Sequence, residues 1–391
     1  MATPVGDSYS TSSGGVIAAG RHVTPEWYRS SAIGEWSSLP NSTLSSSGVG
    51  WSGTNPGGSG GYQAIVGAWG GGCLNTVGIY HGGVFIPGIF LIIFGGGHGD
   101  YAGNELYAYG PLESDAPAWR RLNDPTIPAA VNVARSNGYP VSRHSYDALV
   151  YLPTVNKMLC IGASGMYSNG FASNSADLFD FSVNPLTENP WTTADTGFPA
   201  FNGGGIGPIN MLSSYDSETG KAWGIGQGNA QKIGSYAVSD GSWQSWNIDN
   251  PDGTSNGKAG LYPDKSLLVF LSGSGGVRAV DLRSAPSLYS PSVTGSPPSI
   301  GRALDWDSKT GSFVSWSQNS NEVHFLSPGA NPYNGGDAWA WSSVSPTSGA
   351  TPTAPSANGH LFGRFRVVNK GGITGYLVMS LATSAIYFYR T

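Results

Sequence analysis

Six copies of one two-strand pattern recur along the sequence and restrict the folds open to it. Each copy has an apolar segment after a Pro- or Gly-containing turn, followed by a segment in which apolar and polar residues alternate. The apolar segments are 90–94, 158–161, 222–225, 267–271, 313–316 and 376–379. The alternating segments are 105–109, 177–181, 235–238, 277–280, 322–326 and 385–389. Such repetition indicates small sheets that bury their faces against one another.

An aromatic residue in a further strand follows every copy except the last; these residues are Trp119, Trp191, Trp243, Tyr289 and Trp341. The sixth copy ends at Thr391 without one, but 34–40, around Trp36, is similar to 118–122. Pairing that N-terminal strand into the last sheet would close a ring and remove its free edges. The sequence therefore predicts an all-β protein, a six-bladed β-propeller closed by an N-terminal strand. A seven-bladed ring that uses 62–66 in another blade is the alternative.

The predicted propeller spans 34–391, and residues 1–33 form an N-terminal arm. The arm is rich in Ser, Thr and Gly and has little apolar periodicity. Two interpretations stay open: a flexible tail, or a segment that docks on a neighbouring protein.

Charge and composition exclude several classes of protein. The net charge is −5 with only 11% charged residues, so no basic field would attract nucleic acid or an anionic membrane. The first residues lack a cationic start followed by an apolar stretch, which predicts no secretory signal, and no run of 18 apolar residues predicts a membrane span. Of the 2 cysteines, Cys160 lies in an apolar run and is expected in the core.

The segment from Phe94 to His98, with Tyr107 and Trp119 downstream, resembles a kelch repeat, the blade unit of kelch and galactose-oxidase-like propellers. Later copies lack the clean double glycine. The block 95–105 also resembles propeller proteins of tailed-bacteriophage virions. That resemblance implies a tail or virion component.

Galactose-oxidase-like enzymes hold copper through Tyr and His and carry a Cys-linked Tyr. The 6 histidines here show no local metal-ligand spacing, and Cys73 has no convincing Tyr partner, so neither a metal nor another cofactor is predicted. The glycines of 95–100 are followed by a strand and not by a Lys-bearing helix, which excludes a phosphate loop. The polar residues of this turn are predicted to bond within it or to hold a sugar: His98, Asp100, Tyr101 and Asn104.

Glycosidases need two carboxylates that flank the bond to be broken. Asp100, Glu105, Asp147 and Asp177 fall on the early blades, but the sequence does not show that they converge. No catalytic residue is predicted.

The first strand of each blade lines the centre of a propeller. Counting four residues back from the expected strand ends gives Gly82, Asp147, Met211, Lys258, Arg302 and Arg364. Three consecutive blades would thus place cations in one sector, facing Asp147. The cations either pair with local carboxylates such as Asp281 and Asp305, or bind an anion or a partner's acidic segment. Lys258, Arg302 and Arg364 are therefore ligand-binding candidates.

Several aromatic residues outside the strands suit either sugar binding or a protein interface; they are Tyr139, Tyr167, Phe171 and Phe201. The leading prediction is a non-enzymatic virion or tail-associated structural protein of a phage. Its expected partners are other tail proteins, reached through residues 1–33, and host-surface polysaccharide. The alternatives are a polysaccharide-active hydrolase or lyase and a free carbohydrate-binding lectin.

Overall fold

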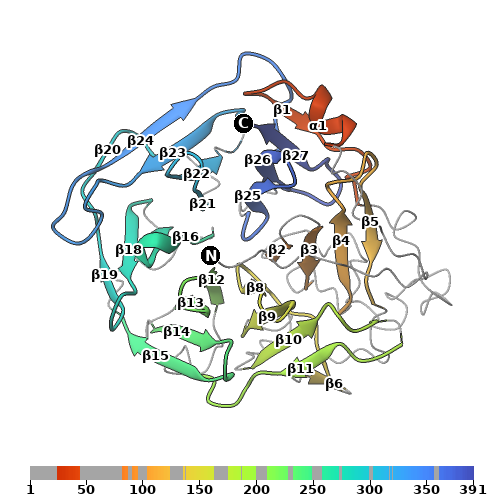
Figure 1. The fold of residues 1–391 in the computed structure, drawn as a ribbon, viewed down its shortest axis with the longest axis vertical. Helices are drawn as coiled ribbons and strands as arrows, with labels where there is room; N and C mark the ends of the chain where they lie inside the picture. The colour runs from red at the N-terminus through yellow and green to blue at the C-terminus, as the bar shows by residue number, and fades with distance from the viewer. Residues whose placement is uncertain are drawn as a thin grey trace, which may run out of the picture.

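The computed structural model describes 24–44, 82–86, 90–95, 104–123, 135–136, 138–162, 175–185, 187–199, 209–227, 232–248, 258–272, 275–298, 303–316, 318, 320–355 and 361–391. Six antiparallel sheets stand around a common centre, as Figure 1 shows. The chain is a six-bladed β-propeller, which confirms the predicted fold class. The segment 62–66, on which a seventh blade would depend, lies outside the described residues.

The blades follow one another along the chain. Blade 1 consists of β2 (Gly82–Ile86), β3 (Phe90–Phe94), β4 (Leu106–Gly110) and β5 (Ala118–Arg121). Blade 2 consists of β8 (Leu149–Leu152), β9 (Lys157–Ile161), β10 (Ala176–Asp180) and β11 (Trp191–Thr193). Blade 3 consists of β12 (Ile209–Asp216), β13 (Lys221–Gln227), β14 (Lys232–Ala237) and β15 (Trp243–Asn247).

The remaining blades repeat the arrangement. Blade 4 consists of β16 (Gly260–Tyr262), β17 (Leu267–Leu271), β18 (Val277–Asp281) and β19 (Ser287–Tyr289), with the short 3-10 helix η6 (Pro263–Lys265) after β16. Blade 5 consists of β21 (Asp305–Asp307), β22 (Ser312–Trp316), β23 (Val323–Ser327) and β24 (Trp339–Val344), and β20 (Val293–Thr294) pairs in parallel with β24. Blade 6 consists of β25 (Phe365–Lys370), β26 (Ile373–Val378), β27 (Tyr387–Arg390) and β1 (Trp36–Ser38). A separate hairpin joins β6 (Arg135–Ser136) to β7 (Tyr139–Pro140).

The ring closes where the N-terminal strand meets the last blade. Strand β1 pairs antiparallel with β27, so that Trp36 lies opposite Tyr389 and Ser38 opposite Tyr387. In Figure 1 the red β1 accordingly lies beside the dark blue β27. The predicted closure by the strand around Trp36 is confirmed.

Successive blades bury one another's faces, and this explains why the second strands are mostly apolar. All of β17 is buried, with Leu268 packed in the cluster shared with blade 3 and Val269 in the cluster shared with blade 5. A strand enclosed on both faces has no solvent-facing position that would favour a polar residue. Cys160 of β9 is likewise fully buried, between blades 1 and 2, as predicted.

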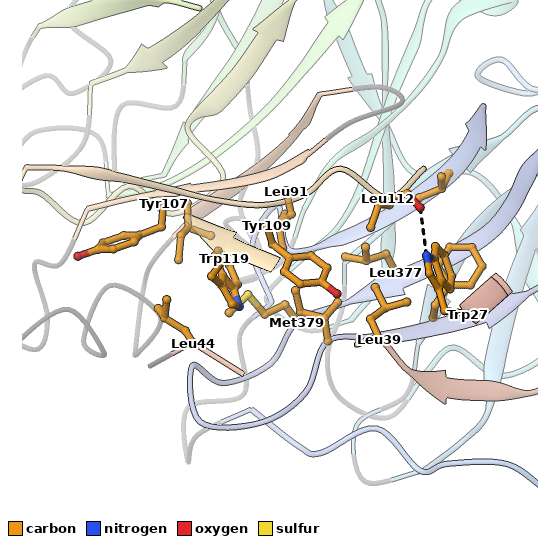
Figure 2. Close-up of a cluster of buried hydrophobic side chains, with 14 of the residues drawn as sticks. Trp27, Leu39, Leu44, Leu91, Tyr107, Tyr109, Leu112, Trp119, Leu377 and Met379 are labelled. Atoms are coloured by element: carbon orange, nitrogen blue, oxygen red, sulfur yellow. Dashed lines mark hydrogen bonds between the residues drawn. The ribbon is translucent and has the colours of Figure 1, made fainter. Parts of the chain in front are cut away.

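The described part of the expected arm packs on the propeller itself. Helix α1 (Glu26–Ser30) places Trp27 and Tyr28 in a cluster with residues of blades 1 and 6. Figure 2 shows Trp27 beside Leu377, its indole N–H donating to the carbonyl oxygen of Leu112 at 3.1 Å. Docking on a neighbouring protein stays a prediction for 1–23, which lie outside the described residues.

Candidate functional site

A cavity of about 200 Å³ occupies the centre of the ring, and residues in or just before the first strand of every blade contribute to its wall. The first strands supply most of the lining, because they stand innermost in each blade. The lining residues are Val84, Phe85, Leu149, Val150, Tyr151, Pro153, Ser213, Ser214, Tyr215, Lys258, Asp305 and Arg366. The cavity is therefore a candidate site for a small ligand.

Asp147 lies immediately behind this wall and connects several blades. Its Oδ2 accepts hydrogen bonds from the backbone N–H groups of Ser213 in blade 3, at 3.1 Å, and Ala259, which precedes blade 4, at 3.2 Å. Its Oδ1 accepts one from the N–H of Gly363, just before blade 6, at 3.1 Å. The Ser213 hydroxyl also donates to the Asp147 carbonyl oxygen. One carboxylate thus holds segments of three other blades around the centre.

The pKa of Asp147 is raised to about 7. Complete burial is the largest cause, because it opposes ionisation; nearby Lys258 and Arg366 and the backbone donors act in the opposite direction. The carboxyl group therefore changes protonation near neutral pH.

Lys258 forms a buried ion pair with Asp305. Its Nζ lies 2.8 Å from Asp305 Oδ1 and also donates to the carbonyl oxygen of Ala259 at 2.9 Å, and its side chain is only 1% exposed. Burial lowers the pKa of Lys258, while Asp305 opposes that shift. The other oxygen of Asp305 accepts from the N–H of Val367 at 2.9 Å. The pairing of a channel cation with Asp305 is thus observed for Lys258, whereas Asp281 pairs instead with Arg283.

Arg364 and Arg366 have different surroundings, although both belong to the start of blade 6. Arg364 is fully buried and donates to the carbonyl oxygens of Leu361 at 3.2 Å and Ser380 at 3.0 Å. Arg366 instead lines the cavity, with Nε bonded to the carbonyl oxygen of Gly363 at 2.8 Å and Nη2 to that of Gly83 at 3.1 Å. The cavity-facing arginine of this blade is therefore Arg366, and the prediction of Arg364 as the channel-lining arginine is wrong.

The other predicted ligand residues are only partly placed. Asn104 is buried, and its side-chain amide donates to the carbonyl oxygen of Pro140, between the first two blades, at 2.9 Å. His98, Asp100, Tyr101 and Arg302 lie outside the described residues.

Two of the early-blade carboxylates, Asp177 and Glu105, have separate partners. Asp177 is 1% exposed and pairs with Arg143 at 3.1 Å and with Arg135 at 2.5 Å. Arg135 also pairs with Asp195 at 2.5 Å. Glu105 accepts a hydrogen bond from the Tyr107 hydroxyl at 2.7 Å. These groups bond to neighbouring side chains and do not line the central cavity.

Within the described ranges, no group of three or more His, Cys, Asp or Glu side chains could hold a metal ion. Of the histidines placed there, His144 contacts the Tyr146 hydroxyl at 3.1 Å and His324 contacts Glu322 at 3.1 Å. The same part of the chain contains no helix long and apolar enough to cross a membrane.

Comparisons with known proteins give structural similarity alone. No family model matches the chain, and no curated protein matches it. A chain of the mitotic checkpoint complex is similar over 81% of this chain and 90% of its own, with a TM-score of 0.46 and 10% identity. The β-propeller domain of Cps50 (Swd1) from Myceliophteria thermophila is similar over 78% and 83%, with a TM-score of 0.39 and 8% identity. The protein YjhT is similar over 78% and 96%, with a TM-score of 0.40 and 12% identity.

Proposed function

We propose that this chain is a non-enzymatic structural component of a tailed-phage virion. In this proposal the propeller is a rigid module associated with the tail, and it contacts host-surface glycans or another tail protein. Residues 1–23 are the segment that would attach it to the particle.

The main structural support for this proposal is the way in which the polar groups at the centre of the ring bond to other blades. Asp147 bonds to segments of three other blades through backbone N–H groups. Lys258 and Asp305 form an ion pair between blades 4 and 5, and Asp305 also accepts from an N–H of blade 6. Groups engaged in this way connect blades and are not free to carry a substrate through a reaction. This arrangement suits a scaffold.

The resemblance of 95–105 to virion propellers supports a location in the virion. Only 11% of the residues are charged, which suits an exposed surface rich in Ser and Gly. A relation to kelch propellers is part of the proposal. It is supported by Phe94, Tyr107 and Trp119, which lie on β3, β4 and β5 of a single blade.

Mass spectrometry of purified phage particles tests the location. Particles released from the strain that carries the gene should contain this chain in constant proportion to a major tail protein. Its absence from particles that contain the other tail proteins would contradict the proposal.

Incubation of the purified chain with host-surface polysaccharide tests the enzymatic alternative. No new reducing ends and no unsaturated sugars are expected, with a known polysaccharide hydrolase and a known lyase as positive controls. Release of either product would favour the hydrolase or lyase.

A further inference from the structure

We propose that the central cavity binds one acidic sugar residue and that Arg366 holds the sugar's carboxylate. This inference deepens the glycan-contact part of the proposed function and rests on it. It assigns the site within the propeller and the chemical class of the ligand.

The size of the cavity fits a single ring. Its volume is about 200 Å³. An apolar cavity of about 150 Å³ accommodates benzene, whereas sites for drug-sized ligands usually have about 300–1,000 Å³. A pyranose ring that carries a carboxylate falls between these limits. The cavity can thus take one monosaccharide unit, with the rest of a glycan outside.

The wall of the cavity contains two cationic side chains, Lys258 and Arg366. A guanidinium has five N–H donors, and the two hydrogen bonds of Arg366 to Gly363 and Gly83 leave the others available. Within the described part of the chain, no carboxylate forms an ion pair with Arg366, whereas Lys258 is already paired with Asp305. Arginine binds carboxylates through two parallel N–H···O bonds. A ligand carboxylate would supply the missing partner.

The rest of the wall suits a sugar better than a bare anion. Tyr151 and Tyr215 provide half-buried aromatic surface, and Ser214 provides a hydroxyl. Asp305 lines the same cavity as a hydrogen-bond acceptor. Phosphate at neutral pH carries more than one negative charge, so Asp305 would repel it. A sugar acid places its single charge near Arg366 and can donate a hydroxyl to Asp305.

Calorimetric titration with methyl glucuronoside and methyl galacturonoside tests this inference. At least one of them should bind saturably, and the matching neutral methyl glycoside and inorganic phosphate should each bind at least about tenfold more weakly, a difference of about 1.4 kcal/mol. Failure of both uronosides to bind, or equal binding of phosphate, would overturn the inference.

Variants locate the site. Arg366→Gln should weaken uronoside binding at least about tenfold, whereas Arg283→Gln, which alters an exposed arginine paired with Asp281, should leave it unchanged. Because Arg366 also bonds to two backbone carbonyl groups, a second variant is needed. Ser214→Leu fills the cavity without removing a charge and should weaken binding to a similar extent. Full affinity in either folded variant would overturn the assignment.

These outcomes are separate from the test of location. If the chain is present in particles but binds no uronoside, only the ligand site is refuted. If it binds the uronoside but is absent from particles, only the virion assignment is refuted.

Discussion

Trp36 and Tyr389 lie opposite each other in the strand pair that closes the ring, and their rings meet edge to face with centroids 5.3 Å apart. Trp36 is only 1% exposed, and its indole N–H donates to the carbonyl oxygen of Asn321 in blade 5 at 2.8 Å. Its ring also meets that of Trp316 at 6.5 Å. This one side chain joins the N-terminal strand to blade 6 and to blade 5.

Trp36→Ala should destabilise the closed ring by about 3–5 kcal/mol, because it leaves a cavity and an unpaired carbonyl group. Urea unfolding followed by tryptophan fluorescence measures the change. Ser38→Ala, at an exposed position of the same strand, should change the free energy of unfolding by less than about 0.5 kcal/mol. Equal stabilities of the two variants would show that β1 adds little to closure.

Asp177→Asn should destabilise the protein by about 3–5 kcal/mol, because it leaves the fully buried Arg143 without its carboxylate. The matched variant is Asp195→Asn, which removes a partner of Arg135 at a site where the carboxyl is 37% exposed. That change should cost about 1 kcal/mol or less. Thermal unfolding of both variants measures the difference, and a larger effect at Asp195 would contradict it.

Asp147 should make the protein less stable as the pH rises from about 4 to about 7. Burial raises the pKa of this carboxyl from 3.8 to about 7 in the folded protein. Between these pH values the folded state holds a proton that the unfolded state has released. Stability that is present at low pH is therefore lost as the pH rises. The loss is at most about 1.4 kcal/mol per pH unit.

Urea unfolding across this pH range should therefore show a more negative slope of stability against pH in the native protein than in Asp147→Asn. Asp195→Asn is the control. Burial opposes ionisation of Asp195, but bonds from Arg135 and from the Ala176 N–H outweigh it and hold its pKa below the ordinary value. Its removal should leave the slope above pH 4 unchanged. Parallel curves for Asp147→Asn and the native protein would refute the assignment.

Gly363→Ala should destabilise the centre of the ring by about 1–3 kcal/mol. An added Cβ would collide with the Gly83 carbonyl oxygen and would lie 2.9 Å from Arg366 Nη2 and 3.0 Å from Asp147 Oδ1. Gly220→Ala is the comparison, because nothing lies within 4 Å of its added Cβ and only its φ of +65° is unfavourable. Chemical denaturation should show the larger loss for Gly363→Ala, and the reverse order would contradict the crowding described.

The strands were predictable from the sequence because their signals are local. The run 267–271 is apolar throughout and is β17, and the match between the segments around Trp36 and Trp119 identified the displaced strand. Both inferences needed only the repeat and the requirement that a ring leave no unpaired edge.

The centre of the ring was less predictable, because counting residues depends on where each first strand begins, and β25 begins only at Phe365. Counting back from an expected strand end selected Arg364, which is buried against backbone carbonyl groups, and missed Arg366 two positions later. The partners of Asp147 are backbone N–H groups up to 216 residues away. A backbone donor leaves no residue-type signal, so nothing in the sequence could identify these partners.

The hydrogen bonds of Asp147 also affect how the molecule unfolds. Repeat proteins whose units touch only their neighbours can lose them one at a time. Here a carboxylate before blade 2 bonds to segments that begin blades 4 and 6, neither of which is adjacent to blade 2 in the ring. Unfolding of any one of these blades disturbs the hydrogen bonding of the others. The propeller should therefore unfold in one cooperative transition and not blade by blade.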